Sequence, residues 1–212
     1  MNKAQEFTRR TFLKGSLAAA GAASMGVANA RTKPTAEDIT WLPGYELRQL
    51  ISQKVLSPVE VTGHFLDRIS RLDPVIHAYI TVDPDDVMKQ ARVAEQRVMS
   101  GEPLGPLHGL PISIKDLYNT RGLRTTQGSM IYKDFVPDHD AILVERLRQA
   151  GAIILGKTQT PEFATFPRTT TLMAGECRNP WNPDHITGAS SGGSGAAVAS
   201  GMSCFSIGSD GG

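Results

Sequence analysis

The chain has 212 residues, of which 40% are hydrophobic and 20% are charged, and its net charge at pH 7 is +1. This composition is typical of a globular protein and excludes a largely disordered chain. The charges are nearly balanced and do not form clusters, which argues against nucleic acid as a partner.

The first 30 residues are predicted to be an export signal. Thr8-Arg9-Arg10-Thr11-Phe12-Leu13-Lys14 precedes a Gly/Ala-rich apolar run that ends in Ala28-Asn29-Ala30. A charged region, a short apolar region and a small-residue cleavage site, in this order, are typical of a secretory signal, and the paired arginines indicate the twin-arginine type. We therefore expect the twin-arginine export machinery as a partner and a periplasmic or secreted mature protein, with a net charge of −2.

A membrane anchor is the alternative interpretation of the same segment. The apolar run from Ser16 to Ala30 is short and only weakly hydrophobic. A transmembrane helix needs about 20 predominantly apolar residues. We therefore expect no stable membrane anchor.

Helices are predicted first in chain order after a linker over residues 31–36. Helical periodicity runs from Ala36 toward Val55 with a break at Pro43-Gly44. Ser57, Pro58 and Glu60 then form a helix start, with a capping serine, a proline at the first position and a glutamate placed to close a capping box. Apolar residues recur at steps of three and four from Val59 to Leu72, which predicts an amphipathic helix ending before Pro74.

Strands and helices alternate over the next stretch of the chain. The predicted elements are a strand over Val75–Val82, a helix over Asp85–Ser100, a loop over Gly101–Gly109, a strand over Pro111–Ile114 that leads to Lys115, a helix over Asp140–Ala150 and a strand over Ala152–Leu155. This alternation indicates an α/β layered domain. No domain boundary is expected within residues 37–212.

Gly151-Ala-Ile-Ile-Leu-Gly156-Lys157-Thr158 fits the phosphate-loop pattern of nucleotide-binding proteins. A phosphate loop follows a strand and precedes the helix whose amino-terminal end faces the phosphates. Here the residues between the two glycines favour a buried strand, and the predicted helix comes before them. We therefore reject nucleotide binding.

The residues with catalytic potential are Lys115 and the serines of a glycine-serine run from Gly188 to Gly195. Lys115 follows an apolar strand, and burial would favour the neutral amine that a general base requires. Alone, such a lysine is more typical of a strand end that reaches water. The glycine-serine run could be a flexible linker, but it leads directly into the small residues Ala196–Gly201, which predict a tightly packed helix start.

Together these segments resemble the amidase signature family. The resemblance is carried by Gly109–Asp116, by the run from Gly188 to Gly201 and by Gly208–Gly212, and it also includes Leu104–Gly109, Gln127–Ser129 and Asn179–Asn182. It covers roughly residues 46–212. It implies the amidase signature fold, a mixed sheet flanked by helices and incomplete in this chain, and hydrolysis of a carbon–nitrogen amide bond through a serine acyl-enzyme.

The resemblance also implies a role for each site residue. Lys115 would be the base and Ser190 the bridging serine, which follows a cis peptide bond in the family. Ser191 would support the loop at the substrate, and Gly211 and Gly212 would contribute backbone N–H groups to the oxyanion hole. The family's nucleophilic serine would come just past Gly212. We therefore expect residues 31–212 to be the amino-terminal part of a single amidase signature domain, inactive and poorly soluble by itself.

No metal or cofactor is implied. The histidines His64, His77, His108, His139 and His185 show no metal spacing and no evident acid partner for a triad. Cys177 and Cys204 could form a single disulfide, but a chain that folds in the cytoplasm before twin-arginine export favours free thiols. Oligomeric state remains open.

Two other functions remain open. One is a non-catalytic binding protein on the same fold. The other is a glutamyl-tRNA amidotransferase A-type subunit, which shares these motifs but works in the cytoplasm, so that the export signal argues against it. The expected substrate is a small-molecule amide that the sequence does not identify.

Overall fold

The computed structural model describes residues 33–211, and a four-stranded sheet in the order β1-β3-β2-β8 forms their centre. Its strands are β1 (Tyr79–Val82), β2 (Pro111–Lys115), β3 (Ile153–Thr158) and β8 (Phe205–Ile207). Strand β2 runs parallel to both β3 and β8, whereas β1 is antiparallel to β3. The sheet is therefore mixed, and the predicted α/β class is confirmed.

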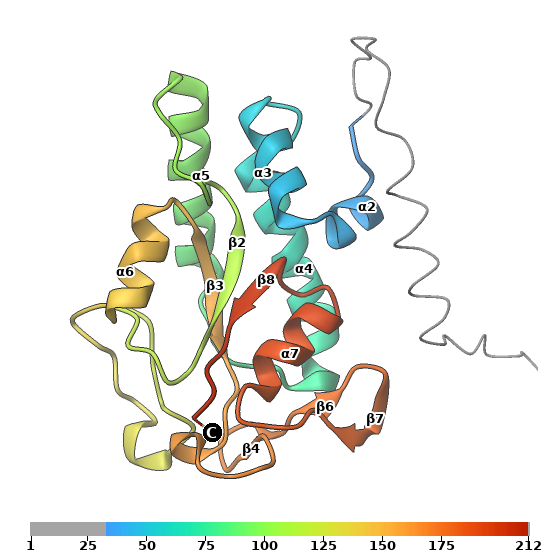
Figure 1. Cartoon of the computed structure of the whole chain (residues 1–212), viewed down its shortest axis with the longest axis vertical. Helices are drawn as coiled ribbons and strands as arrows, with labels where there is room; N and C mark the ends of the chain where they lie inside the picture. The colour runs from blue at the N-terminus through green and yellow to red at the C-terminus, as the bar shows by residue number, and fades with distance from the viewer. Residues whose placement is uncertain (1–32, 212) are drawn as a thin grey trace, which may run out of the picture. The chain divides into compact units, whose positions relative to one another are not determined.

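Helices lie on both sides of this sheet. They are α2 (Ala36–Trp41), α3 (Gly44–Ser52), α4 (Pro58–Ile76), α5 (Pro84–Ser100), α6 (Ile142–Gln149) and α7 (Gly192–Ala199). Figure 1 shows α5 and α6 to the left of β2 and β3, and α3, α4 and α7 to the right. The smaller elements are the 3-10 turns η1 (Met130–Tyr132) and η2 (Glu162–Ala164) and two small sheets, β4 (Thr170–Thr171) with β5 (Gly175–Glu176) and β6 (Arg178–Asn179) with β7 (Asn182–Ile186).

Helix α4 begins as predicted. The Ser57 side chain accepts hydrogen bonds from the backbone N–H groups of Val59 and Glu60, so Ser57 is the N-cap. The second half of the expected capping box is replaced. The Glu60 carboxylate forms an ion pair with Lys33 at 2.8 Å instead of accepting from the Ser57 N–H. Helix α4 is therefore capped by the serine hydroxyl.

The predicted end of α4 before Pro74 is wrong. The helix continues through Pro74 to Ile76, whose side chain is buried in the core. The backbone N–H of His77 still bonds the Asp73 carbonyl, and His77 ends the helix in the left-handed conformation with φ 56°. A proline near the carboxyl end removes only one helical hydrogen bond, and the burial of Ile76 compensates for that loss.

The strand predicted over Val75–Val82 is consequently shorter. It begins at Tyr79, because Val75 and Ile76 belong to α4. The Asp73 carboxylate accepts hydrogen bonds from the backbone N–H groups of Ala78 and Tyr79 and so fixes the turn between helix and strand.

The core is built on β2 and β3, in which every residue is buried. Strand β3 extends to Thr158, three residues beyond the predicted end at Leu155, because Lys157 and Thr158 find polar partners inside the protein. The helices predicted over Asp85–Ser100 and Asp140–Ala150 are confirmed within two residues at each end. In the described part of the chain, no helix is long and apolar enough to cross a membrane.

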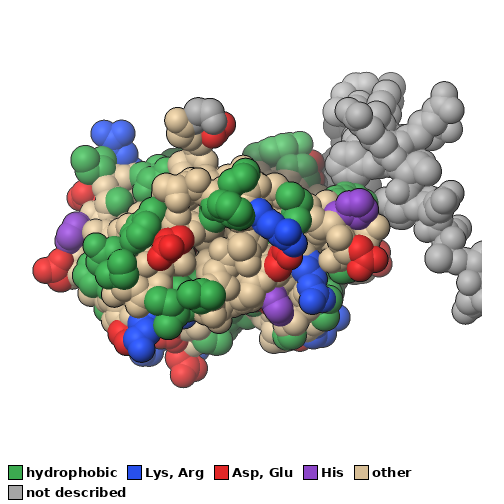
Figure 2. Space-filling model, turned by 90° about the horizontal axis from the view of Figure 1, so that it is seen from below, with side chains coloured by type: hydrophobic (Ala, Val, Ile, Leu, Met, Phe, Trp, Pro, Cys, Tyr) green, Lys and Arg blue, Asp and Glu red, His purple; other side chains and the backbone are tan. Residues whose placement is uncertain are grey.

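Apolar side chains are exposed around η1 and η2, which lie at the lower end of Figure 1. Ile131 is 77% exposed, and Tyr132 contacts the rings of Phe135 and Phe163. Figure 2, seen from below, shows apolar side chains gathered on this face. Exposed apolar groups of this kind favour association between molecules. The poor solubility expected of the chain by itself stays a prediction.

Candidate active site

Lys115 is the last residue of β2, at the carboxyl end of a buried parallel strand. Ile112 and Ile114 precede it with no exposed surface, and β3 and β8 flank the strand on either side. The Lys115 side chain is itself 0% exposed. The strand therefore presents an amine that is shielded from water.

The Lys115 amine meets two serines. Its Nζ lies 2.6 Å from Ser190 Oγ and 3.0 Å from Ser209 Oγ, and it also donates to the Ser209 carbonyl at 3.3 Å. The peptide bond between Ala189 and Ser190 is cis. The structure thus joins two segments that are 75 residues apart in the sequence.

Two influences act on the pKa of Lys115. Burial removes the amine from water, disfavours its charged form and lowers the pKa below the usual 10.5. The carboxylate of Asp210 favours the ammonium and acts in the opposite direction, but burial is the larger influence. The site therefore favours a neutral amine more than solvent would.

Ser191 fixes the segment that brings Ser209 to the lysine. Its Oγ donates to the Ser209 carbonyl at 2.9 Å and accepts from the Ser209 N–H at 3.0 Å. Gly208 permits this contact, because a Cβ at position 208 would lie 2.8 Å from Ser191 Oγ. The two adjacent serines of the glycine-serine run thus have different partners, Lys115 for Ser190 and the backbone of Ser209 for Ser191.

Helix α7 packs directly against the sheet. The Gly193 N–H donates to the Gln159 carbonyl at 3.1 Å, and a Cβ at position 193 would lie 2.4 Å from the Gln159 nitrogen. Ser194 Oγ lies 2.7 Å from Thr158 Oγ1 and donates to the Ile207 carbonyl. The helix begins at Gly192, earlier than the predicted small-residue start at Ala196, because the glycines let its first turn touch β3.

Ser209 was missed by the sequence analysis. Its signal was a hydroxyl residue next to Asp210 inside the terminal glycine run, and its contact with Lys115 depends on the folding of β8 beside β2. Gly211 is exposed, and a Cβ there would meet no atom within 4 Å. The residues of the export signal and Gly212 lie outside the described residues, so the oxyanion role expected of Gly212 stays a prediction.

The stretch that matches the phosphate-loop pattern forms a strand. Residues Ile153–Thr158 are β3, in the middle of the sheet, as the apolar composition predicts. The Lys157 amine is fully buried and donates to Thr120 Oγ1 and Thr125 Oγ1. The stretch therefore differs from a loop whose backbone N–H groups wrap an anion.

The histidines lie in different surroundings. His64 contacts Thr40, His77 contacts the Pro74 carbonyl, and His108 contacts the Ala94 carbonyl. His139 has an acid partner that the sequence analysis did not identify, Asp138, with Nδ1 and Oδ1 2.7 Å apart, but both side chains are exposed. Among residues 33–211, no three histidine, cysteine or acidic side chains are arranged to hold a metal ion.

The two cysteines are separate thiols. Cys177 is buried, and Cys204 donates from Sγ to the Pro111 carbonyl at 2.8 Å. Burial raises the pKa of each thiol to about 12. Neither thiol is thus activated as a nucleophile.

The site therefore combines a buried lysine with a serine that follows a cis peptide bond, on a mixed α/β sheet. Known families match both parts of the chain. Residues 60–212 match the model of the amidase family, and residues 6–26 match that of the twin-arginine translocation signal sequence. The chain belongs to the amidase signature family, and it carries a twin-arginine signal sequence.

The relatives are longer proteins. A glutamyl-tRNA(Gln) amidotransferase subunit of the A type, from Acidothermus cellulolyticus, is 45% identical over 165 residues, which are 78% of this chain and 33% of that protein. The solved structure of a fatty acid amide hydrolase is similar, with a TM-score of 0.80 and 30% sequence identity. The match covers 84% of this chain and 31% of the hydrolase chain. The structure of a bacterial aryl acylamidase is similar, with a TM-score of 0.73 and 31% sequence identity. This match covers 77% of this chain and 34% of the acylamidase chain. The chain spans about a third of the length of these relatives.

Proposed function

We propose that the whole protein is an amidase that hydrolyses a carbon–nitrogen amide bond of a small molecule through a serine acyl-enzyme. Lys115 is the base, Ser190 is the bridging serine, and the nucleophile is the serine that the family motif places just past Gly212. The observation that carries this proposal is the 2.6 Å contact between the buried Lys115 Nζ and Ser190 Oγ.

The proposed chemistry moves one proton along two hydroxyls. The nucleophile's proton passes to Ser190 Oγ while the Ser190 proton passes to the neutral Lys115 amine, so the attacking oxygen forms its bond to the amide carbon as the lysine becomes an ammonium. The same path then returns a proton to the leaving amine, and water hydrolyses the ester in the second half of the reaction. A separation of 2.6 Å permits the hydrogen bond in either direction.

Ser191, Gly211 and Gly212 serve the substrate in this proposal. Ser191 holds the Ser209 backbone and so sets the path of the segment that leads to the glycines. The backbone N–H groups of Gly211 and Gly212 donate to the oxyanion.

The proposed place of action is the periplasm or the exterior of the cell. The twin-arginine signal over residues 6–26 supports export by that route. Residues 31–212 are proposed to be the amino-terminal part of one amidase signature domain, which the match over residues 60–212 supports.

A second candidate is a component of an amidotransferase that acts on transfer RNA. The names of curated relatives such as the 45% identical protein of Acidothermus cellulolyticus favour it. The export signal argues against it, because aminoacyl-tRNA is found in the cytoplasm. Activity of the purified whole protein alone, without transfer RNA or partner proteins, distinguishes the two.

The test is an amide-hydrolysis screen of the mature whole protein and its variants. Anilides and primary carboxamides are supplied, and the released amine or ammonia is measured. Lys115→Ala is expected to lower kcat/KM by about 10²–10⁴-fold, whereas Lys133→Ala, an exposed lysine paired with Asp134, leaves it unchanged. Hydrolysis that persists in Lys115→Ala would contradict the assignment, and a folded wild-type protein without hydrolysis would favour a non-catalytic binding protein.

A further inference from the structure

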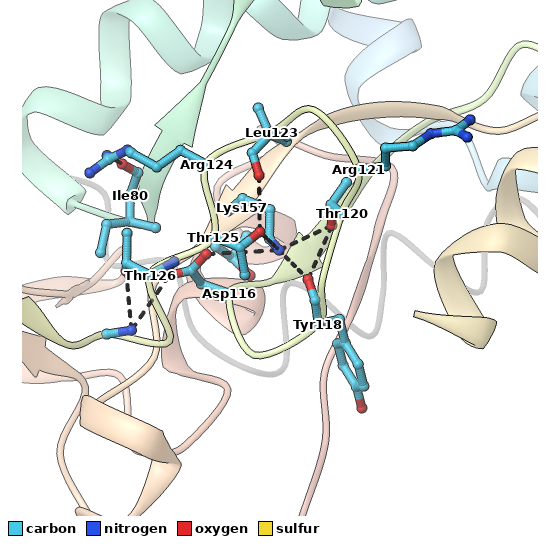
Figure 3. A network of polar contacts seen from close by, with 12 residues as sticks. Ile80, Asp116, Tyr118, Thr120, Arg121, Leu123, Arg124, Thr125, Thr126 and Lys157 are labelled. Carbon is cyan, nitrogen blue, oxygen red and sulfur yellow. Dashed lines mark hydrogen bonds and ion pairs between the residues drawn. The ribbon is translucent and has the colours of Figure 1, made fainter. Parts of the chain in front are cut away.

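A second lysine lies buried beside the first. Figure 3 shows the Lys157 amine surrounded by polar groups of the segment that follows Lys115. Its Nζ donates to the Tyr118 carbonyl, to Thr125 Oγ1 at 2.9 Å and to Thr120 Oγ1 at 3.0 Å. These three acceptors satisfy the three protons of an ammonium group. Lys157 is thus built into the interior as a hydrogen-bonded cation.

Asp116 completes the buried pair. Its Oδ1 lies 3.8 Å from Lys157 Nζ and has no hydrogen-bond partner among the described residues. Its Oδ2 accepts from the Thr126 hydroxyl at 2.5 Å and from the Thr126 N–H at 3.0 Å. Both side chains are 0% exposed. The pair therefore links β3 to the loop beyond β2 with charges that water does not screen.

The pair lies on the opposite face of the sheet from the Ser190 contact. In the parallel register Lys157 stands opposite Ile114, whereas Lys115 stands opposite Thr158. Side chains alternate between the faces of a strand. Thr158 contacts Ser194 on α7, so Lys115 and Thr158 face α7, and Asp116 and Lys157 face away from it.

Backbone hydrogen bonds hold the turn that joins the pair to Lys115. Asp116 is the next residue, and its N–H donates to the Thr158 carbonyl at 3.0 Å. The Tyr118 N–H donates to the Lys115 carbonyl at 3.1 Å, while the Tyr118 carbonyl accepts from Lys157. The Asp116 carbonyl accepts from the Gln127 N–H at 3.1 Å. Lys157 thus holds the turn that closes on the backbone of Lys115.

We propose that Lys157 and Asp116 are positioning residues for Lys115. From the far face of the sheet they fix the turn after β2, and this turn sets the direction in which the Lys115 side chain leaves the strand toward Ser190. A lysine amine stands at the end of four methylene groups, so a small rotation of the backbone displaces Nζ by much more than it displaces Cα. The proposal rests on the proposed function, in which Lys115 is the base.

The test separates positioning from stability. Lys157→Met keeps most of the length of the side chain without its charge, Asp116→Asn keeps the shape, and the double variant removes both charges. Each single variant is expected to unfold at lower temperature because it leaves an unpaired buried group, and the double variant regains part of this loss. The matched control is the exposed pair Lys133 and Asp134, 3.9 Å apart, with the same two substitutions.

Two readouts report on Lys115 itself. The first readout is NMR of the mature whole protein labelled with ¹³C-lysine. The Cε signal that is missing from the spectrum of Lys115→Ala belongs to Lys115, and its shift with pH gives the Lys115 titration without any assay of hydrolysis. In the mature whole protein, kcat and KM for an anilide are measured against pH. In the folded double variant we expect the Lys115 midpoint to rise by about one pKa unit, since an amine that leaves Ser190 regains water. The acid limb of the profile of kcat against pH is expected to move to higher pH together with this midpoint, while KM stays unchanged.

Each outcome decides the role of the pair. A folded double variant with the wild-type Lys115 titration and pH profile overturns the proposal and leaves the pair a structural role only. If the double variant does not fold, Thr125→Val, which removes one acceptor of Lys157, is expected to move the Lys115 midpoint in the same direction by less, and an unmoved midpoint overturns the proposal. If the wild-type protein hydrolyses no amide, the proposed function fails, and the NMR titration still decides whether the pair positions Lys115.

Discussion

Lys115 depends on its surroundings for its proposed role. A lysine in water is an ammonium at neutral pH and cannot accept a proton. Burial at the end of β2 lowers its pKa. Two serines contact its amine: Ser190 is the proposed path for the proton, and Ser209 holds the amine in place. At the scale of one residue, the site is thus a balance between desolvation and the nearby charge of Asp210.

This balance predicts the pH dependence of hydrolysis. The rate of the whole protein should rise with pH as Lys115 loses its proton, with a midpoint below 10.5. Asp210→Asn removes a charge that favours the ammonium, so the Lys115 pKa falls further and the acid limb of kcat should move to lower pH. Profiles of kcat against pH for wild type, Asp210→Asn and the exposed control Asp134→Asn check this. A limb that moves to higher pH in Asp210→Asn contradicts it.

At the scale of elements, α7 depends on how closely its glycines approach the backbone just after β3 and just before β1. A Cβ at Gly193 would meet the Gln159 nitrogen at 2.4 Å and the Ala78 carbonyl oxygen at 2.5 Å, both of them backbone atoms. Backbone cannot move aside as the end of a flexible side chain can. The contact between α7 and the sheet therefore requires glycine at this position.

A pair of substitutions tests this requirement. Gly193→Ala should lower the free energy of unfolding by about 1–3 kcal/mol or more, because the methyl group displaces α7 from the sheet. Gly195→Ala lies in the same helix, where a Cβ would meet nothing within 4 Å. It should be neutral or raise stability by up to about 1 kcal/mol through helix propensity. Denaturant unfolding of the mature protein measures both, and equal effects at the two positions would contradict the packing argument.

The elements show what local sequence determines and what it does not. The alternation of helices and strands, the Ser57 cap and the buried Ile153–Leu155 run were predictable because each depends on neighbours in the chain. The passage of α4 through Pro74 was not, because it depends on the burial of Ile76 in the core.

The candidate site likewise contains residues that the sequence predicts and residues that it does not. Family motifs predicted that Lys115 and Ser190 belong together, and the structure places them in contact. Ser209 and the Lys157–Asp116 pair were not predicted. Their partners come from strands and loops distant in sequence, so that only the register of β2 with β3 and β8 brings them into place.

At the scale of the whole molecule, buried ionisable groups connect stability to pH. Burial lowers the pKa of Lys157 to about 8, although Asp116 and Asp140 favour its charged form. Burial raises the pKa of Cys177 and Cys204 to about 12, from 9. Stability changes with pH wherever the folded and unfolded states bind different numbers of protons. The lysine and the thiols therefore act in opposite directions above pH 9.

The contribution of Lys157 has a definite sign. Between about pH 8 and 10.5 the unfolded chain keeps the Lys157 proton and the folded chain loses it. The unfolded state then binds more protons, so this contribution to the free energy of unfolding rises with pH through that window and is constant below it.

Comparing wild type with Lys157→Met cancels the contribution of the thiols, which titrate in both proteins. A Lys115 pKa that rises in the variant adds to the stability advantage of wild type in the same direction as Lys157 does. The stability advantage of wild type over Lys157→Met, from denaturant unfolding at pH 7 to 10.5, should be smallest below pH 8 and should grow toward pH 10.5. The advantage of wild type over the double variant Asp116→Asn with Lys157→Met should also grow with pH, since the double variant too lacks the lysine. An advantage that shrinks as the pH rises would mean that the folded state holds the Lys157 proton more tightly than the unfolded chain does. The buried pair would then be dominated by the attraction of Asp116 rather than by desolvation.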